Sequence, residues 1–202
     1  MKLYYTPGAC SLAPHIALCE LGASFSTEKV SLQTKKTETG ADYTTINSKG
    51  SVPALVLDDG HMLTEAAVIL QYIADAKPDA GLIPRPGTFE RYRVLEWLNY
   101  IASDVHKGFS PLFNPNASAD WRAGALALLA ARFAWLSGQL AAKSYLMGES
   151  FSVADAYLFT VLSWSSHVGI DLGQWPVLAA YQARVGHRPK VQEALRAEGL
   201  VG

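Results

Sequence analysis

Cysteine is scarce in this chain, since Cys10 and Cys19 are the only two among 202 residues. Both fall in one predicted helix, where nine residues at about 1.5 Å of rise each separate them by roughly 13 Å, too far for a disulfide. Ala13 stands three residues after Cys10, so there is no CxxC pair and no resolving thiol for a two-cysteine redox cycle. The Cys and His spacings of common metal sites are also absent, and we expect no metal.

Charge of either sign is low as well. Lys and Arg number 17 against 18 Asp and Glu, a net charge of −1 that gives no field to attract nucleic acid or an anionic membrane. The most apolar stretch, residues 123–136, is interrupted by Arg132 and is expected to be too short to span a bilayer, and the first residues lack the apolar core of a signal peptide. We therefore expect a soluble, cytoplasmic protein with small-molecule partners, no nucleic acid and no membrane.

The first part of the chain alternates strand and helix signals. A strand, a helical period that ends at Gly22 and a second strand predict a parallel βαβ unit. Two apolar runs joined by Asp58-Asp59-Gly60 predict a β-hairpin, which a further helix follows. The predicted strands are residues 3–5, 25–32 and the runs on both sides of 58–60, and the predicted helices are 11–22, 41–46 and 65–76.

A segment rich in proline and glycine, residues 77–87, is typical of an interdomain linker. Every long segment beyond it is helical in period. The predicted helices are residues 88–108, 118–142, 152–168, 176–186 and 189–198. We therefore expect an α/β domain over residues 1–80, a linker over 81–87 and an all-helical domain over 88–202.

Capping residues mark where the predicted helices begin. Ser, Thr and Asp before an apolar period accept hydrogen bonds from the first N–H groups of a helix. Ser152 followed by Asp155 resembles a capping box with Asp in place of Glu. The candidate N-caps are Ser11, Thr64, Thr88, Ser118 and Ser152.

Cys10 is the candidate nucleophile because it lies at the start of a predicted helix. Pro7-Gly8 ends the first strand, and the unpaired N–H groups of the helix then face the sulfur. The positive end of the helix dipole favours the thiolate and lowers the pKa of such a thiol below its free value of about 8.5. The alternative is a buried cysteine that acts as a small apolar side chain.

Asn99, Ser103 and His106 follow a spacing of i, i+4 and i+7, which predicts one polar stripe on an otherwise apolar helix. His106 titrates near neutral pH and is suited to steer a proton or hold a thiolate, and the alternative is a packed histidine with satisfied nitrogens. Lys35 could bind a carboxylate, or be only a solvated charge. Glu65 could receive an ammonium group, or only complement the dipole of the helix that follows.

Four motifs together resemble the bacterial beta-class glutathione S-transferases, and the resemblance covers essentially the whole chain. The cysteine of the first motif and the pair His106-Lys107 are typical of this class, whereas other classes use Tyr or Ser. The resemblance implies a thioredoxin-like α/β domain (βαβ-ββα) followed by an all-α domain, and a homodimer. The motifs are YTPGACS at residues 5–11, SVPAL at 51–55, WLNYI at 97–101 leading to His106-Lys107, and FSVAD at 151–155.

The resemblance implies that glutathione binds as substrate, with Cys10 and His106 as catalytic residues. Pro53 would be cis, so that Val52 pairs with the cysteinyl part of glutathione, while Lys35 meets the glycyl carboxylate. Many relatives carry Ser or Thr where this chain has Ala66, so only its backbone N–H is available and weaker binding is expected. The implied glutathione-binding residues are Ala9, Cys10, Lys35, Val52, Pro53, Glu65, Ala66, Asn99, Ser103, Asp104, Val105 and His106.

Several activities are open for such a site. In conjugation, the glutathione thiolate attacks a hydrophobic electrophile, and in thiol transfer or peroxidase side reactions Cys10 forms a mixed disulfide. The alternatives are a glutathione-dependent disulfide or dehydroascorbate-type reductase and a non-enzymatic carrier of ligands. Aromatic residues at helical spacing are more often core than pocket, but the candidates to line the electrophile pocket are Tyr5, Phe109, Phe113 and Trp164.

Overall fold

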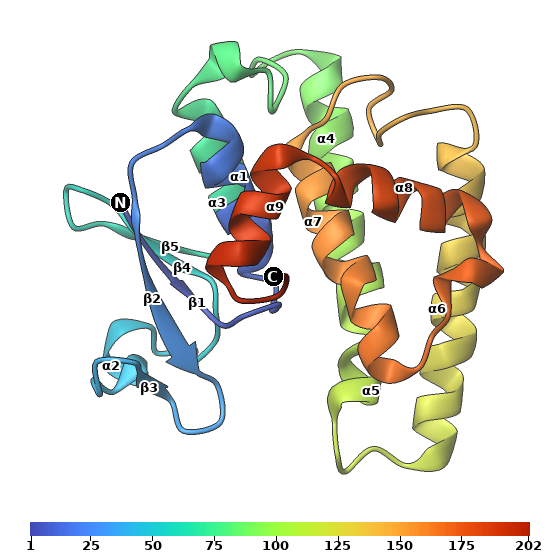
Figure 1. The fold of residues 1–202 in the computed structure, drawn as a ribbon, viewed down its shortest axis with the longest axis horizontal. Coiled ribbons are helices and arrows are strands. Elements are labelled where there is room, and N and C mark those ends of the chain that lie inside the picture. Colours follow the sequence, from blue (N-terminus) through green and yellow to red (C-terminus); the bar gives the residue numbers. More distant parts are fainter. The chain divides into compact units, whose positions relative to one another are not determined.

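The computed structural model describes all 202 residues, which form two compact units (Figure 1). The first unit comprises Met1–Ile83 together with His187–Gly202, and the second comprises Pro84–Gly186. The C-terminal segment, which the sequence analysis assigned to the helical domain, thus belongs to the first unit. It does so because α9 (Pro189–Ala197) packs against α1 (Leu12–Leu21).

A five-stranded mixed sheet forms the centre of the first unit, in the order β3-β2-β1-β4-β5. β1 is parallel to β2, β4 is antiparallel to β1, and β5 is antiparallel to β4. This confirms the predicted thioredoxin-like βαβ-ββα arrangement, to which the short β3 is an addition. The strands are β1 (Lys2–Tyr5), β2 (Ser26–Ser31), β3 (Lys36–Thr37), β4 (Ala54–Val56) and β5 (Met62–Thr64).

Helices cover this sheet and have the predicted positions. α1 contacts α3 as well as α9, so nearly all of its residues are buried, and it ends at Gly22 in the left-handed conformation. Thr64 is not the cap of α3, because it lies in β5 and Glu65 takes the capping position. The other helices of this unit are α2 (Tyr43–Ile46), α3 (Ala66–Asp75) and the 3₁₀ turn η1 (Pro78–Ala80).

The second unit is all helical, as predicted. Thr88 and Ser118 accept the expected capping bonds, and Ser152 and Asp155 form a full capping box. The predicted helix over 88–108 is interrupted by a π-helix, and the one over 152–168 continues beyond Leu162 only as a 3₁₀ helix. The elements are α4 (Phe89–Tyr100), η2 (Ile101–His106, π), α5 (Ser110–Phe113), α6 (Ala119–Leu140), α7 (Val153–Leu162), η3 (Ser163–Val168), η4 (Leu172–Gln174) and α8 (Pro176–Gly186).

α6 is longer than the apolar stretch that the sequence indicated. Its 22 residues are enough to cross a membrane by length and composition alone, so the expectation that this segment is too short was wrong. Within the unit it packs against α5 and α8, and Arg132 donates to the carboxylate of Asp104 on η2 at 2.8 Å. Trp121, Leu128 and Trp135 remain about half exposed on its outer side.

Candidate functional site

Cys10 lies in the loop between β1 and α1, and its side chain is directed at the backbone of another loop. Its sulfur donates to the carbonyl oxygen of Val52 at 3.1 Å. The carbonyl oxygens of Ala9 and Cys10 accept from the N–H groups of Leu12 and Ala13, so the chain already turns helically at the cysteine. The thiol is half-buried and lies at the first turn that precedes α1.

Ser11 does not cap α1 as predicted. It already has helical angles (φ −65°, ψ −18°), and its hydroxyl makes no capping bond. Instead its Oγ accepts from the N–H of Thr6 at 3.1 Å and donates to the Thr6 carbonyl at 3.2 Å. The serine therefore closes the loop that carries Cys10, because both hydrogen bonds of its hydroxyl are made to Thr6.

A buried carboxylate from the C-terminal segment holds the same loop. Glu198 Oε2 accepts from the N–H of Gly8 at 2.8 Å, and its Oε1 lies 2.9 Å from Nδ1 of His15. The Glu198 and His15 side chains are 0% and 3% exposed, so both depend on these partners. Burial, with the charge of Glu198 as the second cause, raises the pKa of Tyr5.

Glu198 is not among the residues predicted from the sequence. Its only signal is one acidic residue directly after an amphipathic helix, and such residues are usually solvated. The burial of this carboxylate follows from the packing of α9 on α1, which no local pattern predicts. Leu200, from the same segment, lies 3.5 Å from where a side chain on Gly8 would begin, and Gly8 has a φ of +70° that favours glycine.

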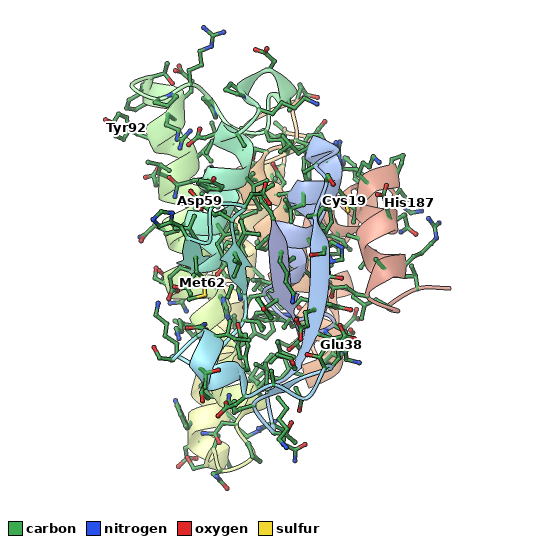
Figure 2. All side chains as sticks on the ribbon, turned by 90° about the vertical axis from the view of Figure 1, so that its left-hand side faces the viewer. Cys19, Glu38, Asp59, Met62, Tyr92 and His187 are labelled. Carbon is green, nitrogen blue, oxygen red and sulfur yellow. The ribbon has the colours of Figure 1, made fainter.

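Cys19 is in a different environment from Cys10, although both belong to the same helical region. It is 4% exposed and lies on the side of α1 that faces α9 (Figure 2). Burial, with a smaller effect of the nearby Glu193 charge, raises the pKa of its thiol to about 12. Cys19 is therefore a neutral core residue at physiological pH, and it offers no thiolate for chemistry.

The segment 50–53 includes Val52 and Pro53, two of the predicted glutathione-binding residues, and it contacts two others, Cys10 and Lys35. The Val52–Pro53 peptide bond is cis, as the resemblance implied, and Val52 lies outside the β1–β4 ladder, which begins at Ala54. Lys35 is half-buried and donates from Nζ to the carbonyl of Gly50 at 2.8 Å, so it is more than a solvated charge.

Glu65 precedes α3 in an uncommon conformation, with a φ of +69°. Its carboxylate pairs with the ammonium of Lys49 at 2.5 Å, a partner that the sequence did not reveal, and Lys49 also donates to the Thr64 hydroxyl. Ala66 is the first residue of α3, at the end of the helix where N–H groups lack intrahelical partners. Glu65 therefore lies next to the ammonium of Lys49, and Ala66 lies at the start of α3.

In the second unit, His106 is surrounded by aromatic rings. Its Nδ1 lies 2.8 Å from the Tyr157 hydroxyl, and its ring is 4.7 Å from that of Trp164 in an edge-to-face contact. Trp164 in turn contacts Phe109 and Phe113, at 5.6 and 5.8 Å between ring centres. The structure thus brings three of the four predicted pocket aromatics together with the predicted catalytic histidine.

These aromatics differ in what they could offer a ligand. Phe109 is fully buried and is therefore a core residue, whereas Phe113 is 51% exposed. Tyr5 belongs to the first unit, where its ring packs on that of His15 at 5.9 Å. Among the predicted residues, Phe113 is the one with most surface available for an apolar molecule.

The polar residues of η2 form a local network. Ser103 donates to the carbonyl of Asn99 and to the carboxylate of Asp104, at 2.9 and 2.8 Å. The bond from Arg132, followed by that from Ser103, holds the pKa of Asp104 below its usual range. Because η2 is a π-helix, the predicted i, i+4, i+7 stripe of a regular helix is distorted here. Val105 is fully buried and belongs to the core of the second unit.

The structure contains no group of three or more His, Cys, Asp or Glu side chains that could hold a metal ion. The predicted catalytic and glutathione-binding residues with ionisable side chains are Cys10, Lys35, Glu65, Asp104 and His106. Their chemistry is that of nucleophiles, proton carriers and charged contacts.

Comparison with known proteins identifies the family. The N-terminal domain model of glutathione S-transferases matches residues 1–75, and the C-terminal domain model matches residues 119–184. The chain is 46% identical over 200 residues to glutathione S-transferase GstA of Escherichia coli O157:H7, covering 99% of this chain and 100% of that one. It is 37% identical over 207 residues to GST-4.5 of Xanthomonas campestris, with 99% and 100% covered.

Solved structures give the same result. The bacterial transferase BphK, in a ternary complex, is 54% identical with a TM-score of 0.97, covering 99% of this chain and 100% of that one. The beta-class enzyme of Sphingomonas chungbukensis is 52% identical, with a TM-score of 0.97 and both chains fully covered. A sphingomonad transferase in complex with glutathione is 49% identical, with a TM-score of 0.96 over the whole of both chains. The chain therefore belongs to the glutathione S-transferase family, in its bacterial beta class.

Proposed function

We propose that this glutathione transferase conjugates glutathione to hydrophobic electrophiles at a site built around Cys10. The observation that carries the proposal is the 3.1 Å contact between the Cys10 sulfur and the Val52 carbonyl. Val52 lies outside the sheet ladder, so its backbone can pair with an extended peptide, and a cysteinyl residue bound there would have its sulfur beside Cys10. Glutathione is the substrate, and the solved complex of a relative contains it.

The two ends of glutathione would meet opposite charges. Lys35, with its ammonium on the Gly50 carbonyl, is suited to the glycyl carboxylate. Glu65 and the N–H groups at Ala66 are suited to the ammonium and carboxylate of the γ-glutamyl end. Binding there would require Glu65 to share its carboxylate with Lys49. Ala9 and Pro53 would complete this part of the site.

As the resemblance to the beta class implies, we propose that residues of α4 and η2 in the helical domain also take part in glutathione binding. The residues proposed for the electrophile are Tyr5, Phe113 and Trp164, with the buried Phe109 in contact with Trp164. The Tyr157 hydroxyl orients the His106 ring, which makes His106 a suitable carrier of the proton that leaves a thiol. The residues proposed from this domain are Asn99, Ser103, Asp104, Val105 and His106.

The proposed mechanism begins with the Cys10 thiol on the Val52 carbonyl. That bond favours the neutral thiol, while the dipole of α1 favours the thiolate. The cysteinyl N–H of glutathione would compete for the same carbonyl and so release Cys10 to stabilise the glutathione sulfur. In conjugation the thiol proton of glutathione passes to His106 or water, and the resulting thiolate then forms a bond to the electrophilic carbon while the leaving group departs.

Thiol transfer is the second candidate, and the position of Cys10 favours it as a side activity. The Cys10 thiolate would attack the glutathionyl sulfur of a mixed disulfide between glutathione and another thiol, and would expel that thiol as its thiolate. A second glutathione thiolate would then attack the Cys10–glutathione disulfide, releasing the Cys10 thiolate and oxidised glutathione. A reductase that depends on this route loses all activity in Cys10→Ala, whereas conjugation survives in part.

Steady-state conjugation of an aryl halide tests the proposal, with Lys36 as a matched control for Lys35. Lys36 is its exposed neighbour in β3. We expect Lys35→Ala to raise the KM for glutathione about tenfold with little change in kcat, because a charge-assisted contact is lost. Lys36→Ala should leave both constants unchanged. Equal effects of the two variants would remove Lys35 from the site, and absence of turnover in the wild type would favour a carrier.

We further propose that the protein is a cytoplasmic homodimer. Apolar side chains on α4 and α6 of the second unit remain exposed, among them Phe89 (73%) and Tyr92 (62%), and Tyr92 projects outward in Figure 2. Trp135 is 47% exposed although its ring packs on that of Tyr100 at a tilt of 58°, with 4.9 Å between ring centres. A second copy of this chain would cover such a surface.

Light scattering over a range of concentrations tests the dimer. Trp135→Glu should shift the mass from two chains toward one, because a charge would be buried in the interface. Leu32→Glu is the matched control, since Leu32 is exposed on the first unit outside α4 and α6. A wild-type mass of one chain would contradict the proposal.

A further inference from the structure

The second unit contains a pocket of about 620 Å³ at the end of α7, between η3, η4 and α8. Pockets that hold small molecules commonly have about 300 to 1,000 Å³. All of its lining residues fall between 162 and 182, so it is built by this unit alone. None of them is among the residues assigned above to glutathione or to the electrophile.

Two buried oxygen atoms of the lining residues lack a hydrogen-bond partner. Ser165 is 1% exposed, and its hydroxyl oxygen is unpartnered. Gln182 donates from Nε2 to the carbonyl of Phe159 at 3.1 Å, which fixes the orientation of the amide and leaves its Oε1 buried without a donor. An unsatisfied buried polar atom costs about 1–3 kcal/mol, so two of them on residues that line one pocket call for a partner from outside the chain.

The chemistry of the lining selects the kind of molecule. Gln182 Oε1 can only accept a hydrogen bond, and the Ser165 hydroxyl can also accept. Asp171 adds a negative charge, one oxygen of which accepts from the N–H of Gly173 at 2.8 Å. No lysine, arginine or histidine lines the pocket, and Leu162, Ile170 and Leu172 supply apolar surface. The pocket therefore favours a donor with positive charge and an apolar body, and disfavours anions.

We propose that this pocket is a second binding site, for a small organic ammonium ion with an apolar body. The ammonium donates to Ser165 Oγ and Gln182 Oε1 in the field of Asp171, while the body packs on the leucines and the isoleucine. Glutathione and its conjugates carry net negative charge and are excluded by the same field. The site does not depend on the catalytic proposal above, because it uses none of its residues.

Three probes that share an aromatic hydrocarbon group and differ in their terminal functional group test the proposal on the intact protein. Calorimetric titration should show saturable binding of 3-phenylpropylammonium. 3-Phenylpropanol should bind about tenfold more weakly because it lacks the charge, and 3-phenylpropionate should not bind. Saturating glutathione should not displace the ammonium. Equal binding of the three probes, displacement by glutathione, or no saturable binding of the ammonium would overturn the proposal, the last leaving only ordered water in the pocket.

Two substitutions of lining residues test whether the ammonium probe binds in this pocket. Ser165→Ala loses no hydrogen bond within the protein, and Asp171→Asn keeps an oxygen for Gly173 while it removes the charge. Each should weaken binding of the ammonium about fivefold. The matched controls are Ser137→Ala and Asp120→Asn, which alter the same residue types outside the pocket, and they should leave the affinity unchanged. If the two pocket variants bind like the wild type, the site is wrong.

Discussion

Cys10 and Cys19 stand nine residues apart at the two ends of one helical region, yet their surroundings are opposite. Cys10 is half-buried in a loop, within 3.1 Å of a carbonyl outside the sheet ladder. Cys19 is buried between α1 and α9, and its pKa is raised to about 12. We therefore expect the position of each sulfur, relative to the helix start and to the C-terminal segment, to decide which of the two can react.

The largest expected difference between the two thiols is in covalent chemistry. Incubation with oxidised glutathione should add one glutathione to the wild type and to Cys19→Ala, as measured by intact mass. Cys10→Ala should show no adduct, because the remaining thiol is buried and neutral. An adduct on Cys10→Ala in the folded protein would show that Cys19 is accessible. The expected difference in reactivity between the two thiols would then be wrong.

Cys19 should instead affect stability at alkaline pH. Its pKa is raised from 9.0 to about 12 on folding, so the neutral thiol is favoured in the folded state. Its contribution is therefore fully present below pH 9 and is lost as the pH rises toward 12, by about 1.4 kcal/mol per pH unit. Urea unfolding between pH 8 and 11 should show a shallower loss of stability in Cys19→Ala than in the wild type. The same pH dependence in both proteins would mean that folding does not raise the pKa of the Cys19 thiol.

Glu198 holds the loop that carries Cys10, because its carboxylate accepts from the N–H of Gly8. Glu198→Ala leaves the N–H of Gly8 and the ring of His15 without their buried partner, and should lower the free energy of unfolding by about 2–4 kcal/mol. It should also slow alkylation of Cys10 in the folded protein, since the loop is no longer held. Glu198→Gln is the matched control, because its amide can accept from Gly8 and donate to a neutral His15. Equal loss in both variants would show that the charge, rather than the two bonds, is required.

The smallest expected effect concerns glutathione affinity. Ala66→Ser adds a hydroxyl at the first turn of α3 and should tighten glutathione binding about threefold, by one neutral hydrogen bond. Ala67→Ser is the control one residue further along the helix. Fluorescence titration measures both affinities. If Ala66→Ser binds no more tightly than the wild type, the γ-glutamyl end does not lie at this helix start.

Much of the fold could be predicted because its signals are local. The hairpin around Asp58-Asp59-Gly60 and the caps at Thr88 and Ser118 depend on residues within a few positions of each other. The capping box of Ser152 and Asp155 is equally local, although its burial is not. Asp155 also accepts from the N–H of Leu146 and the hydroxyl of Tyr181, which no sequence pattern indicated.

The failed predictions arose where a residue took a different partner from the one that helix capping would give it. Ser11 bonds to Thr6 across a loop instead of capping its own helix, and Thr64 is drawn into β5 by pairing with Ala54. The π-helix from Ile101 to His106 was not expected either, because a regular helix satisfies the same apolar period. In each case two local structures were compatible with the sequence, and packing selected one.

Neighbouring residues are enough to predict most helices and strands, the position of Cys10 before a helix and the motifs that identify the family. Three features appear only in the folded chain: residues 187–202 join the first unit, Glu198 holds the Cys10 loop and Lys49 pairs with Glu65. They could not be predicted because the partners lie outside any local sequence pattern. Burial and hydrogen bonding join Gly8 to Glu198 across nearly the whole sequence, and only the folded chain brings such residues together.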